Sequence, residues 1–170
     1  MFLLWIYDKI LSCFINVFYV EQRNYKNGMN RYIKKRLLTQ INKSRVSIST
    51  ICELDLCYTS HIHHNGYLFG TVLYWWWVCL TKIFNSFIPN GYCDMYKIDT
   101  EIIALSIYFP LSNGRLYWYN CFLQPNRKND IVFAHILDTI YTSSYTKIRL
   151  GSTTENSKLN IGATMTDIFW

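Results

Sequence analysis

The sequence predicts an irregular α+β fold, in which one or two apolar helices accompany a small β-hairpin region and the packing is poor. Three observations carry this prediction. Apolar runs occupy residues 1–20 and 67–88, the dipeptide Asn113-Gly114 separates two apolar stretches, and the local signals do not agree on one common core. Disagreement between local preferences counts against a well-funnelled fold.

Composition limits what the chain can be. Its 170 residues suffice for about one domain. Charged residues make up 16%, below the roughly 25% of an average soluble protein, and aromatic residues make up 18%. Residues with A- and T-rich codons (Ile, Asn, Tyr, Lys and Phe) dominate, whereas Ala, Gly, Arg and Pro are scarce. An AT-rich genome explains this bias, so a dubious reading frame that is not under selection is one hypothesis.

The first segment, residues 1–20, is apolar apart from Asp8 and Lys9. It lacks the positive start and small-residue cleavage site of a secretory signal peptide. Two adjacent charges near the middle of a membrane span cost several kcal/mol. The segment therefore predicts a weak membrane anchor or, equally, a buried core helix.

Residues 21–45 hold the basicity of the chain, whose net charge is +6. Apolar Met29, Ile33, Leu37 and Ile41 recur four residues apart, which predicts an amphipathic helix with basic residues around it. Such a helix fits a solvated surface, a loop beside a membrane span, or a nucleic-acid backbone. Because no nucleic-acid-binding motif accompanies the charge, nucleic acid is not expected as a partner, and binding through residues 31–45 remains the alternative function.

Residues 46–64 are rich in β-branched side chains and predict a strand that leads into a His-rich loop. The segment contains the only metal-like cluster of the sequence: Cys52, Cys57, His61, His63 and His64. Zinc accepts these ligand types, but their spacing differs from that of zinc fingers. No metal site is therefore expected.

Residues 67–88 predict a transmembrane helix. As a helix the run is about 33 Å long, enough to cross a hydrocarbon core of about 30 Å, and Pro89-Asn90-Gly91 ends it. Tryptophan prefers the membrane interface, so Trp75, Trp76 and Trp77 would lie at the wrong depth. With this span, the Lys/Arg excess places residues 21–45 on the cytoplasmic side.

Residues 92–141 predict a hairpin followed by a helix. With Asn113 and Gly114 as a two-residue turn, Leu111 pairs with Leu116 and Leu105 pairs with Phe122. Pro110 requires its strand to lie at an edge, at least locally. Asn129 or Asp130 is the expected N-cap of the helix. Residues 142–170, rich in Ser, Thr and Asn, predict a loose polar tail, and Cys93 and Cys121 are the only plausible disulfide pair.

No catalytic or phosphate-binding motif is present, and nothing points to a known family. The sequence therefore predicts no catalytic, cofactor-binding or metal-binding residues and no enzymatic activity. The function that it favours is that of a small membrane protein with a lipid bilayer as its partner.

Overall fold

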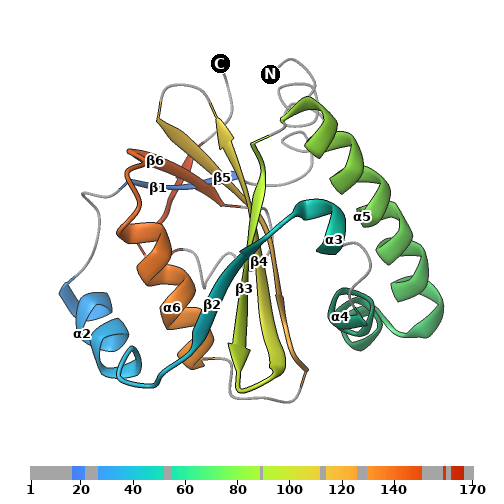
Figure 1. The fold of residues 1–170 in the computed structure, drawn as a ribbon. Coiled ribbons are helices and arrows are strands. Elements are labelled where there is room, and N and C mark those ends of the chain that lie inside the picture. The colour runs from blue at the N-terminus through green and yellow to red at the C-terminus, as the bar shows by residue number, and fades with distance from the viewer. Residues whose placement is uncertain are drawn as a thin grey trace.

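The computed structural model contains one mixed β-sheet with helices on both faces (Figure 1). It describes residues 17–21, 27–51, 55–88, 90–111, 114–125, 130–150, 159 and 162–166. The strands are β1 (Val17–Glu21), β2 (Asn42–Val46), β3 (Tyr92–Ile98), β4 (Glu101–Leu111), β5 (Arg115–Leu123), β6 (Lys147–Leu150) and β7 (Thr164–Thr166). The helices are α2 (Asn27–Arg36), α3 (Ile48–Ile51), α4 (Asp55–Asn65), α5 (Tyr67–Phe87) and α6 (Asp130–Tyr141).

The sheet has the order β2-β3-β4-β5-β6-β1-β7. Helices α2 and α6 cover one face, and α3, α4 and α5 cover the other (Figure 1). Each face has its own core: Tyr96, Tyr108 and Ile136 are fully buried under α6, and Ile51 and Phe109 are fully buried under the other helices. The predicted irregular, poorly packed fold is therefore wrong.

Strand β4 explains why the local patterns disagreed. It lies between β3 and β5, and both of its faces are covered, so that Leu105 and Ile107 enter one core while Ala104 and Tyr108 enter the other. A strand buried on both sides has a continuous apolar run instead of an alternating pattern. Its sequence therefore does not reveal which face is the core.

The predicted hairpin is present as β4 and β5, but its register differs near the turn. Leu111 pairs with Arg115 instead of Leu116, whereas Leu105 pairs with Phe122 as predicted. A β-bulge between Ile107 and Tyr108 shifts the register by one residue and reconciles the two halves. Pro110 lies beyond Tyr108, the last residue of β4 that pairs with β3, so its strand is locally at an edge.

Other elements depart from the sequence prediction. Most of the predicted strand and His-rich loop at residues 46–64 is helical, because α3 and α4 occupy it. The predicted loose tail contributes strands β6 and β7, which pair with β5 and β1. Residues 1–16 of the predicted weak anchor lie outside the described residues.

Helix α5 confirms that residues 67–87 are helical, but the predicted membrane span is wrong. Among the helices that the structure describes, none combines the length and the apolarity that a bilayer crossing requires. One face of α5 packs on the sheet through Tyr74, Trp77 and Phe84, while Trp75 and Trp76 are exposed. Because the span is wrong, the predicted single-pass or two-pass topology with residues 21–45 on a cytoplasmic side is wrong as well.

Candidate functional site

The candidate site lies along β5, beyond its last described pair with the parallel strand β6. Four residue pairs join them, from Arg115–Lys147 to Trp118–Leu150. Strand β5 then continues to Leu123 along β4, without a partner on its β6 side among the described strands. An unpaired strand edge offers backbone N–H and C=O groups in a row.

A β-bulge lies next to the last described pair of β5 with β6. Tyr119 is the extra residue of the bulge, because Trp118 pairs with Tyr108 and Asn120 pairs with Ile107. It follows directly after Trp118, the last residue of β5 that pairs with β6. A bulge increases the local twist and bends its strand. Residues 120–123 therefore follow a bend in β5.

Alternation along β5 decides which groups face the open side. The Gln124 N–H donates to the Ile103 carbonyl of β4 over 2.9 Å, so the backbone groups of Gln124 point towards β4. Successive residues of a strand point their backbone groups to opposite sides. The N–H groups of Leu123 and Cys121 therefore face away from β4, towards the open side. Asn120 Oδ1 accepts a 2.8 Å hydrogen bond from the Cys121 N–H and caps this donor.

Helix α4 places an imidazole against the same part of β5. The His61 ring lies 5.3 Å from the Phe122 ring, measured between centroids, on the face that α5 covers. His61 Nδ1 is 2.8 Å from the Cys57 carbonyl, which can only accept, so Nδ1 carries the proton and donates. Nε2 of the neutral ring is then the basic nitrogen. Burial lowers the pKa of His61 below its ordinary value, although the Cys57 carbonyl acts in the opposite direction.

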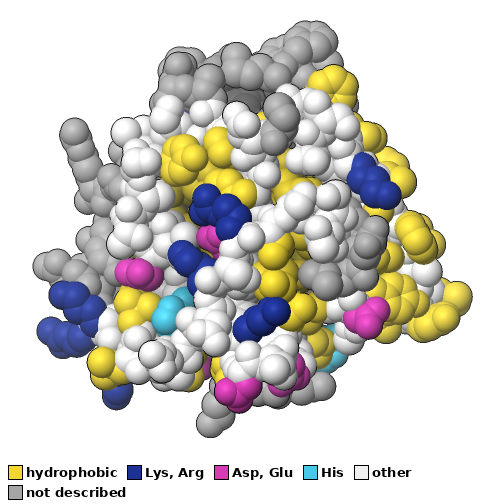
Figure 2. Space-filling view, in the orientation of Figure 1, with side chains coloured by type: hydrophobic (Ala, Val, Ile, Leu, Met, Phe, Trp, Pro, Cys, Tyr) yellow, Lys and Arg dark blue, Asp and Glu magenta, His cyan; other side chains and the backbone are white. Residues whose placement is uncertain are grey.

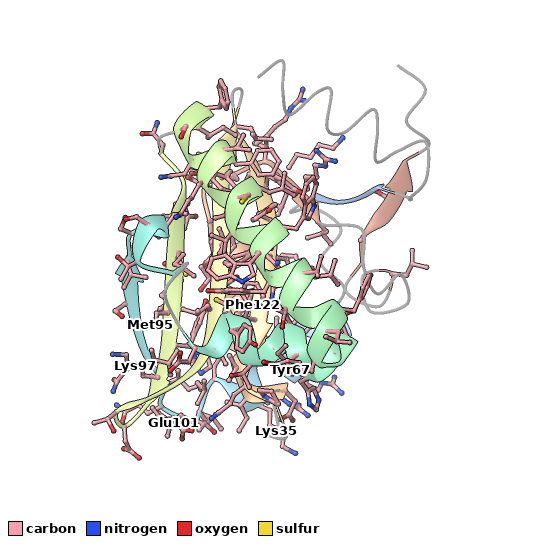
Figure 3. The ribbon with its side chains drawn as sticks, turned by 90° about the vertical axis from the view of Figure 1, so that its right-hand side faces the viewer. Lys35, Tyr67, Met95, Lys97, Glu101 and Phe122 are labelled. Carbon is pink, nitrogen blue, oxygen red and sulfur yellow. The ribbon has the colours of Figure 1, made fainter. Side chains whose placement is uncertain are left out.

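Aromatic side chains surround this imidazole. The Trp77 ring lies 4.8 Å from the Phe122 ring and 5.8 Å from the His61 ring, and Tyr74 lies 5.9 Å from His61. Figure 3 shows Phe122 on the sheet behind α5, the helix that begins at Tyr67. Trp77 Nε1 is buried and has no hydrogen-bond partner among the described residues. A buried donor without a partner is costly and is often found at functional positions.

Helix α6 begins on the other side of the site, shortly after β5 ends. Asp130 stands at its N-terminus and accepts a 2.9 Å hydrogen bond from Arg36 Nε, which lowers the pKa of the carboxyl. A helix N-terminus attracts anions through its free N–H groups and its dipole. Here the chain's own carboxylate stands at that position.

Cys93 and Cys121 do not supply a nucleophile at the site. Burial raises the pKa of Cys93 and of Cys121 to about 12, so both thiols stay protonated at neutral pH. The predicted disulfide between them is absent, since both are free. They lie on either side of β4 and face opposite cores, Cys93 towards α5 and Cys121 towards α6.

The metal-like cluster of the sequence is spread over a helix. Among the described residues, which exclude Cys52, no group of three or more His, Cys, Asp or Glu side chains could hold a metal ion. Cys57 is buried and its Sγ donates to the Ile51 carbonyl over 3.6 Å. His61 and His64 each bond the carbonyl four residues earlier, at Cys57 and Ser60. Both imidazoles are therefore hydrogen-bonded to the backbone of α4.

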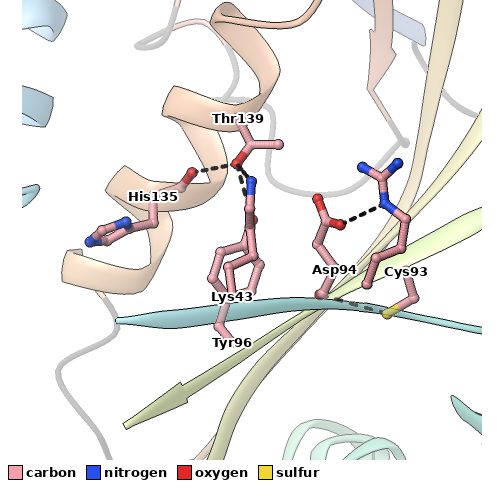
Figure 4. Close-up of polar contacts among 7 residues, drawn as sticks. Lys43, Cys93, Asp94, Tyr96, His135 and Thr139 are labelled. Atoms are coloured by element: carbon pink, nitrogen blue, oxygen red, sulfur yellow. Dashed lines mark hydrogen bonds and ion pairs between the residues drawn. The ribbon is translucent and has the colours of Figure 1, made fainter. Parts of the chain in front are cut away.

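The basic segment is divided between α2 and β2, so the predicted amphipathic helix is present but ends at Arg36. The alternative of nucleic-acid binding is not supported. Two of its cations, although exposed, bond other elements of the fold (Figure 4). Lys43 Nζ donates to Thr139 Oγ1 over 3.1 Å, and Arg45 Nε donates to Asp94 Oδ1 over 3.2 Å. The Arg45 guanidinium also lies 3.8 Å from the centre of the Tyr92 ring. These contacts join β2 to its neighbour β3 and to α6.

No protein-family model matches the chain, and comparison with curated proteins finds no similar sequence. The fold, however, recurs in solved structures. A conserved protein of unknown function from Bacteroides thetaiotaomicron VPI-5482 has a TM-score of 0.62 at 10% identity over 86% of this chain and 55% of its own. FemX has a TM-score of 0.62 at 8% identity over 89% of this chain and 59% of its own. A possible acetyltransferase from Clostridium difficile 630 has a TM-score of 0.50 at 16% identity over 78% of this chain and 97% of its own.

This chain therefore has the fold of acetyltransferase-like domains, and it spans little more than half the length of the first two structures. At such identities the likeness shows the fold alone. The prediction of a small membrane protein is therefore wrong. The likeness in fold also goes against the expectation of no enzymatic activity. Sequence reasoning missed the open edge of β5 and treated His61 only as part of a metal-like cluster.

Proposed function

We propose that this chain is a group-transfer domain, in which an acyl donor with an extended, amide-bearing arm lies along the open edge of β5 and an amine accepts the acyl group. The observation that carries the proposal is that the backbone groups of Cys121 and Leu123 face away from β4 and have no strand partner in the described sheet. An extended chain with amides can bind such an edge as an added strand. The likeness to an acetyltransferase fold supports an acetyl thioester as the donor.

The residues around Phe122 suit the transfer step. The amine nitrogen attacks the acyl carbonyl carbon, the bond to the thiol leaving group breaks, and the amine loses a proton. His61 Nε2 is a base that stays unprotonated near neutral pH, because burial lowers the pKa of the ring. Direct transfer agrees with the protonated thiols of Cys93 and Cys121, which cannot serve as nucleophiles.

Binding to the edge can be tested directly by NMR. Acetyl-coenzyme A and acetyl-pantetheine are titrated into the labelled full chain, and the amide signals of Cys121 and Leu123 are expected to shift. Acetyl-pantetheine is the critical probe, because it keeps the amides but lacks the phosphates that the Asp130 carboxylate would repel. If neither compound shifts these two amides at millimolar concentration, the proposal is wrong.

Transfer is tested with a matched pair of variants. His61→Asn keeps a side-chain N–H for the Cys57 carbonyl but has no basic nitrogen, so kcat is expected to fall by about 10²–10⁴-fold. His64→Asn is the control, because His64 makes the same kind of bond to Ser60 one turn later without a described ring contact to Phe122. Thiol release from acetyl-coenzyme A in the presence of amines is the assay. Equal losses in the two variants would remove His61 from the reaction.

A further inference from the structure

Helix α5 exposes an apolar surface along its whole length. Its exposed large side chains recur at helical spacing on the side opposite the sheet, and we call them the α5 stripe: Leu68, Phe69, Val72, Trp75, Trp76, Ile83 and Phe87. Leu68 is 82% exposed, Trp76 63% and Phe87 57%. Figure 2 shows hydrophobic side chains gathered along the right-hand edge of the molecule, where α5 lies in Figure 1.

The exposed apolar area of the α5 stripe is large for a monomer. An aromatic side chain offers about 150–250 Å², so four aromatic side chains exposed by 57–63% present roughly 500 Å². The largest apolar patch of a typical monomer is about 300–600 Å² in total. The aliphatic members of the stripe bring its area towards the roughly 800 Å² per partner of a standard protein interface.

We propose that the α5 stripe is the interface with a second copy of this chain, whose α5 packs against it in antiparallel orientation about a two-fold axis. The charges of the helix favour this partner. Lys82 is the only charged residue of α5, and no carboxylate lies on the helix. Helices that lie on anionic membranes have a polar face rich in Lys and Arg, which α5 lacks. A symmetric pair needs no complementary charge, provided that the two Lys82 side chains stay apart.

The antiparallel orientation keeps them apart. The midpoint of the α5 stripe, between Leu68 and Phe87, falls between residues 77 and 78. At about 1.5 Å per residue, a two-fold axis there separates the two copies of Lys82 by about 13 Å along the helices, beyond the Debye length of about 8–10 Å. A parallel pair would place Lys82 beside its own copy. Repulsion between the two Lys82 side chains therefore favours the antiparallel arrangement.

The same geometry predicts which cysteines meet. Cys79 is exposed within the stripe, and its two copies would lie about 4–5 Å apart along the helix direction. Packed helices are about 8–10 Å apart, so side chains at this position come within reach of a disulfide or a short cross-linker. Ser86 is also exposed, but its two copies would lie about 25 Å apart in the antiparallel pair.

The test begins with analytical ultracentrifugation of the full chain over a concentration series, in which a dimer is expected at micromolar concentration. Mild copper-catalysed oxidation is expected to link the copies through Cys79 and to give no such product in Cys79→Ser. In a double variant, Cys79→Ser with Ser86→Cys, no cross-link is expected, whereas a cross-link there would overturn the antiparallel arrangement. A chain that stays monomeric up to about 100 µM overturns the proposal, whether or not it binds lipid vesicles.

A surface substitution separates the interface from folding. Trp76→Glu places a carboxylate in both halves of a symmetric interface, and the dissociation constant is expected to rise at least 100-fold. Because Trp76 is already exposed in the monomer, the circular dichroism spectrum is expected to stay unchanged. Leu38→Glu is the control: Leu38 is 86% exposed but lies beyond α2, away from α5. A dimer that tolerates Trp76→Glu, or that is equally weakened by Leu38→Glu, would show that the α5 stripe is not the interface.

Discussion

Replacement of Gly70 by alanine tests the contact that holds α4 and His61 in place. Gly70 is a buried residue of α5. A Cβ atom there would lie 2.7 Å from the His61 carbonyl oxygen and 2.8 Å from the Ile62 Cα atom. Both contacts are with the backbone of α4, which cannot yield as the end of a flexible side chain can. Helix α4 must therefore move away from α5 in Gly70→Ala.

Two opposing effects set the magnitude. Overpacking of a close-packed core costs about 1–3 kcal/mol. Replacing a helical glycine by alanine returns about 1 kcal/mol, because alanine favours the helix. The net expectation is a loss of up to about 2 kcal/mol, which lowers the midpoint of urea denaturation by up to about 1 M if the slope is about 2 kcal/mol per molar. Equilibrium unfolding followed by circular dichroism measures this shift.

The control lies on the same helix. Ser86→Ala also places alanine on α5, but Ser86 is exposed and its hydroxyl bonds only the Lys82 carbonyl, so a change within about 0.5 kcal/mol is expected. If Gly70→Ala were more stable than the unmodified chain by about 1 kcal/mol, helix propensity would dominate and the close approach of α4 to α5 would be refuted. If Gly70→Ala lost transfer activity as well as stability, the movement of α4 would have displaced His61.

Three further predictions concern the site and the sheet. The stability that neutral His61 contributes is present above pH 6.5 and is lost as the pH falls through 6.5 towards the lower pKa of the folded state. The difference in urea midpoint between the unmodified chain and His61→Asn is therefore expected to shrink from pH 7.5 to pH 5. A difference that stays constant would contradict the burial of the imidazole. Asn120→Ala uncaps the Cys121 N–H and is expected to tighten donor binding up to about 10-fold by calorimetry, whereas weaker binding would show that the Asn120 amide itself holds the donor. Arg45→Met leaves the buried Asp94 carboxylate without its ion-pair partner and is expected to destabilise the fold by about 1–3 kcal/mol in urea, while an unchanged midpoint would mean that the pair contributes nothing.

Local signals predicted part of the fold. Asn113-Gly114 marked the turn of the β4–β5 hairpin, and the apolar run that ends at Pro89-Asn90-Gly91 marked α5. The bulge at Tyr119 was not predictable, because both registers bring aromatic residues together and the choice depends on β6, which pairs with β5 across a distance of about 30 residues in the sequence. Parallel pairs are joined by long crossovers and carry no local turn signal.

The site was hidden for the same reason. It depends on β6, a strand in a segment that resembles a polar tail, whose described residues pair with the first half of β5. His61 becomes a candidate base only when α4 is helical, since one helical turn brings its Nδ1 to the Cys57 carbonyl. The β-branched residues before Cys57 favoured a strand, in which no such bond forms. Tertiary packing of α4 against α5 overrides that preference.

The three adjacent tryptophans were ambiguous because a helix cannot hide all of them on one face. Successive helical residues are about 100° apart, so a helix that lies on a sheet buries at most part of such a run. Trp77 takes the buried position, at 6% exposure, and Trp75 and Trp76 are left 59% and 63% exposed. The sequence feature that suggested a membrane therefore marks a helix with two apolar sides. One side is covered by the sheet, and a second copy of the chain would cover the other.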